Sequence, residues 1–298
     1  MSNYNSILIS GPTASGKSKL AMDIAAKIGG VVINADSMQI YNTISLITAR
    51  PSNKDMDMIP HFLYGYIDPK IRYSVGEWVG DIEPLINSLN KIDKTPVIVG
   101  GTGLYFSGLF GEISEIPQIS AKTRSKWEDI KKQKGTEALF HKLKELDPKS
   151  AAIINSTDTT RITRALEVID GTGKSIKDWQ ALPGKTIINK SLSKMIYLCP
   201  PRDVINNNII KRTKEIIGNN QLYEEINLLS SQKISNSYPV MKAIGVKDTI
   251  AYLDGEISIE ILNDRIITNT KKYAKRQLTW ARRKMIDWEW IDEPKYFL

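Results

Sequence analysis

Cysteine and histidine are almost absent from this sequence. Cys199 is the only cysteine, and His61 and His141 are the only histidines. One cysteine cannot form an intramolecular disulfide, and these three residues cannot supply the ligands of a common structural zinc site. We therefore expect no such crosslink or zinc site, and we interpret Cys199 as a small buried side chain at the end of a strand.

Long apolar runs are also absent. No stretch approaches the roughly 20 residues that a membrane-spanning helix needs. Residues 1–5 carry no basic region ahead of the short apolar stretch that follows, so we expect no signal peptide. With 41% hydrophobic and 25% charged residues in 298, we expect a folded cytoplasmic protein with no membrane partner, built as one large domain or as a domain with a sizeable insertion.

The formal net charge of +8 is concentrated in one segment. Residues 265–284 contain eight basic residues and no acidic residue; taking these eight from the total of 41 leaves 33 basic residues against 33 acidic residues elsewhere. A block of this kind on one element indicates a binding surface for a polyanion. The alternative is an ordinary solvated helix face.

Short apolar runs alternate with amphipathic stretches in the first hundred residues. Strands and helices are predicted in turn at residues 6–10, 19–28, 31–33, 76–90 and 96–100. We expect Pro84 to kink or shorten the second helix, and we interpret residues 41–69, which carry three prolines, mainly as loop. The alternation of strand and helix indicates a parallel sheet with helices packed on it.

A glycine-rich motif follows the first predicted strand and fits the pattern G-x-x-x-x-G-K-[ST]. In such a loop the backbone N–H groups surround phosphate oxygens at the positive end of a helix, the lysine adds a charge, and the final hydroxyl is offered to Mg²⁺. The candidate diphosphate-binding residues are Gly11, Pro12, Thr13, Ala14, Ser15, Gly16, Lys17 and Ser18, with Ser18 as the metal ligand. The motif leaves open whether a nucleotide or a pyrophosphate ester binds.

The pattern changes after residue 116, where helical periodicity continues to about residue 190 without a convincing strand. Asp147 followed by Pro148 predicts a helix start, and a strand returns at 195–198. We predict an α/β fold, with a P-loop parallel-sheet core, a helical insertion domain and a helical C-terminal region. The predicted boundaries are 1–118 for the first part of the core, 119–194 for the insertion, and 195–298 for the completion of the core and the basic C-terminal helices.

Asp36 follows the second predicted strand, at the edge where open parallel sheets bind ligands. A carboxylate there contacts Mg²⁺ or accepts a proton; the alternative is a helix cap or a polar loop residue. Residues 37–41 add a hydroxyl, an amide and the ring of Tyr41, groups that could hold a nucleobase. The third strand ends in Gly-Gly-Thr-Gly, where Thr102 offers another hydroxyl.

Together these motifs resemble the bacterial tRNA dimethylallyltransferase (tRNA isopentenyltransferase) family, in order and over nearly the whole chain. The strings that carry the resemblance are GPTASGKS at 11–18, NADSMQIY at 34–41, YSV at 73–75, VGGTGLY at 99–105, RITRALEV at 161–168, KAIG at 242–245 and YAKRQLTW at 273–280. The last string and the Gly-Gly-Thr-Gly-Leu-Tyr segment are far more specific than the phosphate motif.

The resemblance implies transfer of a dimethylallyl group from dimethylallyl diphosphate, with Mg²⁺, to the exocyclic N6 amine of the adenosine on the 3′ side of the tRNA anticodon, releasing diphosphate. It implies that Asp36 is the general base, that Thr102 and Arg124 lie near the reacting centre, and that Arg212 helps to hold the diphosphate. The residues implied to contact the tRNA anticodon stem-loop are Asp36, Ser37, Met38, Gln39, Thr160, Arg161, Ile162, Thr163, Arg164, Lys242, Lys247, Lys275, Arg276, Gln277, Trp280 and Arg282. We expect a monomer.

The sequence departs from the family pattern in three places: residues 47–51, Asn208, and residues 270–272. Three other functions remain open at this point. A P-loop nucleoside or nucleotide kinase fits the phosphate motif and Asp36 but not the basic segment. A non-catalytic RNA-binding protein with a nucleotide-sensing loop fits the charge. A relative that prenylates free adenine nucleotides would not need the segment 275–282.

Overall fold

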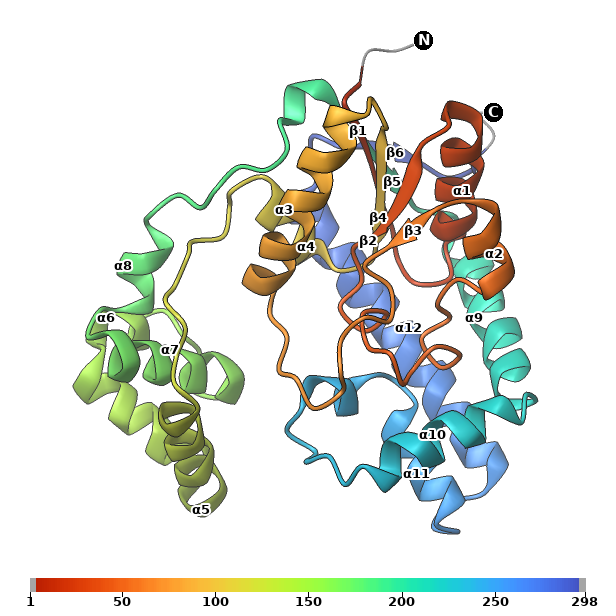
Figure 1. The fold of residues 1–298 in the computed structure, drawn as a ribbon. Helices are drawn as coiled ribbons and strands as arrows, with labels where there is room; N and C mark the ends of the chain where they lie inside the picture. The colour runs from red at the N-terminus through yellow and green to blue at the C-terminus, as the bar shows by residue number, and fades with distance from the viewer. Residues whose placement is uncertain (1–3, 295–298) are drawn as a thin grey trace. The chain divides into compact units, whose positions relative to one another are not determined.

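The computed structural model describes residues 4–294, which form two compact units. The first unit contains the described residues up to Ser107 and from Ile187 onward, and the second runs from Gly108 to Thr186 (Figure 1). The sequence placed the insertion at 119–194. That range overlaps most of the second unit, and its last two residues, 193 and 194, lie in strand β5 of the first unit.

The first unit is built on a parallel sheet of six strands in the order β3-β2-β4-β1-β5-β6. The strands are β1 Ser6–Ser10, β2 Val31–Asn34, β3 His61–Phe62, β4 Pro96–Gly100, β5 Ser193–Leu198 and β6 Glu289–Ile291. Because every pair is parallel, the carboxyl ends of β1, β2 and β4 share one edge of the sheet. β4 lies between the other two, with Val97 opposite both Ile7 and Val32.

The α/β class and the parallel sheet are confirmed, and β1 and β4 match the predicted strands. Two short strands were missed: the two-residue β3 and the three-residue β6 are too short to show periodicity, and their pairing with β2 and β5 defines them. The loop prediction for 41–69 is wrong in part, because α2 (Asn53–Met58) begins there. A capping box between Ser52 and Asp55 starts that helix.

Helices cover the sheet of the first unit and form a second core beside it. They are α1 Lys17–Ile28, α3 Val75–Lys91, α9 Arg202–Ile217, α10 Gln221–Ser231, α11 Val246–Leu253 and α12 Ile259–Lys284, together with the short 3₁₀ helices Lys190–Leu192 and Pro239–Lys242. Pro84 lies inside α3 and does not shorten it. Ser258 caps the start of α12 by accepting a hydrogen bond from the backbone N–H of Ile261. The element α4 (Gly103–Leu109) follows β4.

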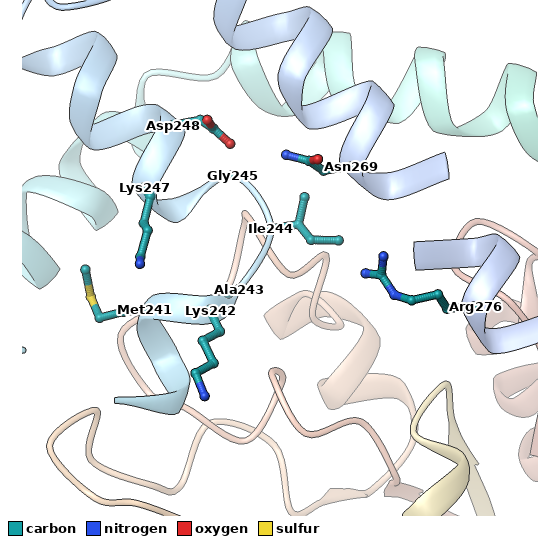
Figure 2. A pocket seen from close by; sticks show the side chains of 9 residues that line it. All are labelled: Met241, Lys242, Ala243, Ile244, Gly245, Lys247, Asp248, Asn269 and Arg276. Atoms are coloured by element: carbon teal, nitrogen blue, oxygen red, sulfur yellow. The ribbon is translucent and has the colours of Figure 1, made fainter. Parts of the chain in front are cut away.

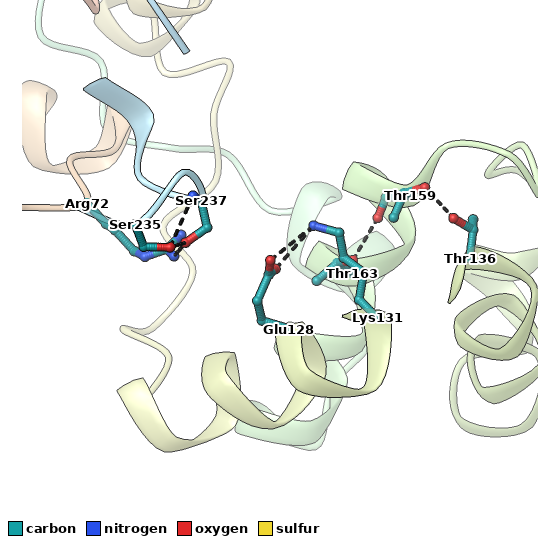
Figure 3. A network of polar contacts seen from close by, with 8 residues as sticks. All are labelled: Arg72, Glu128, Lys131, Thr136, Thr159, Thr163, Ser235 and Ser237. Atoms are coloured by element: carbon teal, nitrogen blue, oxygen red, sulfur yellow. Dashed lines mark hydrogen bonds and ion pairs between the residues drawn. The ribbon is translucent and has the colours of Figure 1, made fainter. Parts of the chain in front are cut away.

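The second unit is helical, as predicted. Its elements are α5 Ala121–Leu146, α6 Pro148–Ala151, α7 Thr159–Thr172 and α8 Ile176–Gln180, and α5 is interrupted by non-helical backbone at Gly135. Asp147 caps α6 and Asp158 caps α7 through their carboxylates. The hydroxyls of Thr136 and Thr159 lie 2.6 Å apart and join α5 to the start of α7 (Figure 3). A buried cluster that includes Trp127 and Leu166 forms the core of this unit.

Among residues 4–294, no helix has both the length and the apolar character required to cross a membrane.

Candidate active site

Three segments with polar side chains meet at the carboxyl edge of the sheet. The glycine-rich loop follows β1, Asp36 follows β2, and Thr102 follows β4. The side-chain oxygen of Thr102 accepts a hydrogen bond from the backbone N–H of Ser37 at 3.0 Å, which ties the last two segments together. The parallel strand order therefore brings together residues that lie far apart in the sequence.

The glycine-rich loop, residues 11–18, is shaped to hold an anion. Ala14 and Gly16 adopt left-handed backbone conformations with φ of 63° and 91°, and α1 begins directly after Gly16. In the described chain no side chain caps this helix, and its first turn carries no acidic residue. The buried hydroxyl of Ser15 also has no hydrogen-bond partner within residues 4–294. Unpaired donors at the positive end of a helix favour a phosphate group.

Two cations stand beside this loop. Nζ of Lys17 donates to the backbone oxygen of Pro12 at 3.2 Å, and Nη2 of Arg212 in α9 donates to Oγ1 of Thr13 at 2.7 Å. Burial lowers the pKa of Lys17 to about 8; the Asp36 carboxylate opposes this shift and Arg212 adds to it. Burial also lowers the pKa of Arg212, again opposed by Asp36. Lys17, Arg212 and Asp36 thus interact electrostatically at one site.

The carboxylate of Asp36 is held by its own loop. Its Oδ1 accepts a hydrogen bond from the backbone N–H of Met38 at 2.9 Å. The buried side chain of Asn34 accepts from the N–H of Asp36 and donates to the backbone oxygens of Asp36 and Leu63. Oδ2 of Asp36 has no hydrogen-bond partner among the described residues, so one oxygen is oriented by the loop while the other is available to a ligand.

Tyrosines that the sequence analysis did not select surround this carboxylate. Burial raises the pKa values of Tyr64, Tyr105 and Tyr273, and the negative charge of Asp36 acts in the same direction on all three. The ring of Tyr105 stacks on Trp78 with centroids 4.4 Å apart. These phenols therefore stay protonated and make the surroundings of Asp36 partly apolar. Tyr105 and Tyr273 lie within the two most specific sequence strings, which was the available signal.

The expectation that Tyr41 offers its ring to a nucleobase is wrong. Tyr41 is fully buried in the helical core, together with Ile40. The side chain of Gln39 is partly occupied as well, because its Nε2 donates to the backbone oxygens of Thr48 and Ala49 at 3.0 Å each. Its amide oxygen and the neighbouring Ser37 and Met38, none of them fully buried, remain the groups of this segment that a ligand can reach.

A carboxylate that the sequence analysis missed fixes the loop after Asp36. Glu225 in α10 accepts hydrogen bonds from the backbone N–H groups of Ser45, Leu46 and Ile47 and from the hydroxyl of Ser45, at 2.7 to 3.1 Å. Nothing in the sequence around Glu225 marks this role, because its partners lie about 180 positions away. Glu225 and Gln39 together hold residues 45–49, the loop that follows the family string at 34–41.

The basic residues of α12 line two cavities on the first unit. One, of about 280 Å³, is lined by Lys242, Lys247 and Arg276 among others, and Figure 2 shows these side chains arriving from the 3₁₀ helix Pro239–Lys242, α11 and α12. The other, of about 420 Å³, is lined by Lys275, Arg276, Thr279, Trp280, Arg283 and Lys284. Lys275, Arg276 and Arg282 are exposed. Clustered basic side chains with an aromatic ring suit a nucleic-acid backbone.

The remaining predicted residues lie in the second unit. Arg124 is in the first turn of α5, and its buried Nε has no partner among residues 4–294. Thr160 and Arg161 are exposed at the start of α7, whereas Ile162 is fully buried in the core of the unit. Thr163 is also buried and donates to the backbone oxygen of Thr159 at 2.7 Å. On this helix Thr160, Arg161 and the half-exposed Arg164 are the side chains accessible to a ligand.

The fold and the site together define a P-loop α/β protein with a basic face suited to a polyanion. The family model for IPP transferase matches residues 39–284, and that for isopentenyl transferase matches residues 4–64. The chain belongs to the tRNA dimethylallyltransferase (IPP transferase) family.

Relatives and solved structures agree with this membership. The tRNA dimethylallyltransferases of Allorhizobium ampelinum and Rhizobium meliloti are 43% and 42% identical, over 97% and 98% of this chain and 95% and 96% of their own. The tRNA isopentenylpyrophosphate transferase of Bacillus halodurans superimposes with a TM-score of 0.66 at 33% identity, covering 96% of this chain and 89% of its own. A eukaryotic dimethylallyltransferase acting on tRNA superimposes with a TM-score of 0.76 at 27% sequence identity. The match covers 92% of this chain and 69% of that protein's chain.

Proposed function

We propose that this member of the family transfers the dimethylallyl group of dimethylallyl diphosphate to N6 of the adenosine 3′ to the anticodon of tRNA, with Asp36 as the base and the glycine-rich loop as the diphosphate site. The observation that carries the proposal is the shared strand edge, where a phosphate loop, two cations and a carboxylate with a free oxygen interact. A phosphate loop alone would fit many functions. The basic α12 supports one that acts on RNA, and membership of the family supports alkylation of a base with Asp36 as the proton acceptor.

The leaving diphosphate gains negative charge as its bond to the allylic carbon breaks. Backbone N–H groups at the start of α1 and the side chains of Lys17 and Arg212 are already directed to this place, so little reorganisation is needed when the charge develops. Fixed donors of this kind stabilise the transition state more than the bound substrate.

The donor set also fits Mg²⁺. This ion keeps several waters and is usually bound by one or two protein groups together with substrate phosphates. Ser18 is exposed in the first turn of α1, and no cluster of three or more metal-ligating side chains occurs among residues 4–294. Ser18 would therefore hold the ion together with the diphosphate. When bound, Mg²⁺ would neutralise part of the diphosphate charge.

Asp36 acts on the nucleophile. As the adenine N6 bonds to the allylic carbon, its N–H becomes acidic, and the free Oδ2 of Asp36 takes the proton. The hydrogen bond from the N–H of Met38 to Oδ1 keeps the carboxylate oriented. The hydroxyl of Thr102 is held at the same turn because its oxygen accepts a hydrogen bond from the N–H of Ser37.

The adenosine must leave its stack in the anticodon loop, at a cost of a few kcal/mol. We assign the offsetting phosphate contacts to Lys242, Lys247, Lys275, Arg276 and Arg282 in the first unit, and to the exposed start of α7 in the second. Because one chain carries all of these residues, we propose that a monomer is sufficient. We also propose that the protein acts in the cytoplasm.

The test compares substrates. Purified protein with Mg²⁺ and unmodified tRNA should consume dimethylallyl diphosphate and release diphosphate, while ATP remains intact. ATP hydrolysis or phosphate transfer without prenylation would support a P-loop kinase instead. Prenylation of free adenosine nucleotides at the rate seen with tRNA would point to the nucleotide-prenylating relative.

A further inference from the structure

A single glutamine joins the basic helix to the phosphate loop. Oε1 of Gln277 in α12 accepts a hydrogen bond from the backbone N–H of Thr13 at 2.9 Å, and its Nε2 donates to the backbone oxygen of Gly101 at 2.9 Å. Both ends of one side-chain amide are therefore used, one on the loop after β1 and the other on the turn after β4. These two bonds fix the orientation of the amide.

The glycines after β4 make room for this helix. A Cβ at Gly101 would overlap Nε2 of Gln277, and a Cβ at Gly103 would overlap the ring of Trp280. Gln277 and Trp280 are three residues apart and therefore lie on the same face of α12. The Gly-Gly-Thr-Gly turn thus leaves space for the side chains of α12. The sequence strings at 99–105 and 273–280 are therefore in direct contact in the fold.

The other side of the phosphate loop is held by α9. Nδ2 of Asn208 donates to the backbone oxygen of Ala14 at 3.1 Å, next to the bond between Arg212 and Thr13. Helices α9 and α12 pack together through a small cluster that contains Ile209 and Ala274. The first half of the loop is therefore positioned by side chains from two C-terminal helices and not by its own backbone alone.

The same turn of α12 carries exposed charge. Lys275 and Arg276 immediately precede Gln277; both line the cavity of about 420 Å³, and Arg276 also lines the other. Their contacts with RNA phosphates would fix the part of the helix from which Gln277 reaches Thr13 and Gly101. In Figure 1, α12 runs along the chain from beside α11 toward the sheet. The turn that carries Lys275 and Arg276 is thus directly bonded to the phosphate loop through Gln277.

We propose that Gln277 is a positioning residue that couples the two substrates: RNA bound to α12 holds the amide between Thr13 and Gly101 and thereby tightens diphosphate binding. The inference rests on the proposed function for the identity of the RNA and the diphosphate. Coupling between binding sites is reciprocal, so diphosphate must tighten RNA binding by the same factor.

The coupling factor is the quantity to measure. The dissociation constant of inorganic pyrophosphate with Mg²⁺ is determined by calorimetry, with and without a saturating unmodified anticodon stem-loop RNA. For the wild-type protein we expect the RNA to lower this constant about tenfold, within the usual range for coupled sites. For Gln277→Leu we expect the ratio to fall to about 1, whatever happens to the binding of pyrophosphate alone.

Three further variants separate positioning from general damage. Gln221→Leu, an exposed glutamine at the start of α10, should keep the wild-type ratio. Gly101→Ala breaks the same contact from the other side and should also abolish coupling. Adding Gly101→Ala to Gln277→Leu should then cost nothing more, because the obstructing amide is gone. Thermal unfolding checks that each variant is folded.

The inference is overturned if wild-type protein shows no coupling, or if Gln277→Leu weakens pyrophosphate equally with and without RNA and so keeps the ratio. This outcome is separate from that of the proposed function. Coupling without any prenylation of tRNA would contradict the proposed function and support the role of Gln277. Prenylation of tRNA with an unchanged ratio in Gln277→Leu would support the function and contradict that role.

Discussion

At the scale of single residues, the proposed chemical step depends on Asp36. One of its carboxylate oxygens accepts a hydrogen bond from Met38, and the other has no hydrogen-bond partner among the described residues. We expect Asp36→Asn to fold normally and to lose about 10²- to 10⁴-fold in single-turnover rate, since an amide cannot accept the proton. The matched control is Asp57→Asn, at an exposed position in α2, which should keep the wild-type rate. Retention of full rate by Asp36→Asn would remove this carboxylate from the mechanism.

Lys17 gives the site a dependence on pH. Its pKa in the free protein is lowered to about 8 by burial, so the ammonium loses its charge as the pH rises through that value. Attraction for a phosphate is then lost, and we expect pyrophosphate binding to weaken above about pH 8. Lys17→Arg keeps the charge and should remove this fall; a fall of equal size in both proteins would assign it to the pyrophosphate itself.

The sequence predicted these residues because each follows a strand within a recognisable motif. It could not predict Glu225, Asn208 or the paired use of Gln277, because their partners are backbone atoms brought close only by the fold. The prediction that the Tyr41 ring contacts a nucleobase was wrong for a related reason. Tyr41 is close to Asp36 in sequence, but its ring points into the buried core.

At the scale of elements, two faces of α12 have different surroundings. Gln277 and Trp280 face the sheet edge, and Lys275 and Arg276 face solvent. We expect Lys275→Gln with Arg276→Gln to weaken tRNA binding and to reduce the slope of log affinity against log salt by roughly 1.5, as expected for two lost phosphate contacts. The control, Lys27→Gln with Lys91→Gln at the far ends of α1 and α3, should leave the slope unchanged. An unaltered slope in the α12 variant would return this face to ordinary solvated surface.

The loop after Asp36 depends on α10. Removing the carboxylate in Glu225→Ala would leave three backbone N–H groups without their acceptor, and bonds to a charged group contribute about 1.5–3 kcal/mol each at most. Since water can replace part of this, we expect the free energy of unfolding in urea to fall by about 2–3 kcal/mol. Glu224→Ala, exposed on the same helix, should change it by less than about 0.5 kcal/mol. Equal effects would show that the carboxylate does not hold the loop.

Elements with full periods were predictable, and short ones were not. The strands β1 and β4 are apolar runs long enough to be predicted from the sequence. β3 and β6 exist because β2 and β5 offer them unpaired edges, which is information that no window of sequence contains. Ser52 and Asp55, which form the capping box of α2, are a helix-start signal in the sequence that the loop prediction for 41–69 did not use.

At the scale of the whole molecule, the parallel sheet brings the phosphate loop and the Asp36 carboxylate to one edge, and the C-terminal helix α12 adds a basic surface. The charge outside residues 265–284 is balanced, so the net charge of +8 is concentrated in that segment of α12. In the proposed function, the phosphate loop holds the departing diphosphate while Asp36 takes the proton from the attacking adenine.

The most direct test of this account follows the label. Protein, Mg²⁺ and dimethylallyl diphosphate labelled in the allyl group are incubated with an unmodified anticodon stem-loop, and with one in which purine riboside, lacking the exocyclic amine, replaces the adenosine 3′ to the anticodon. The account predicts label on that adenosine in the first RNA and none in the second. Label elsewhere in the RNA, or equal labelling of both RNAs, would contradict it.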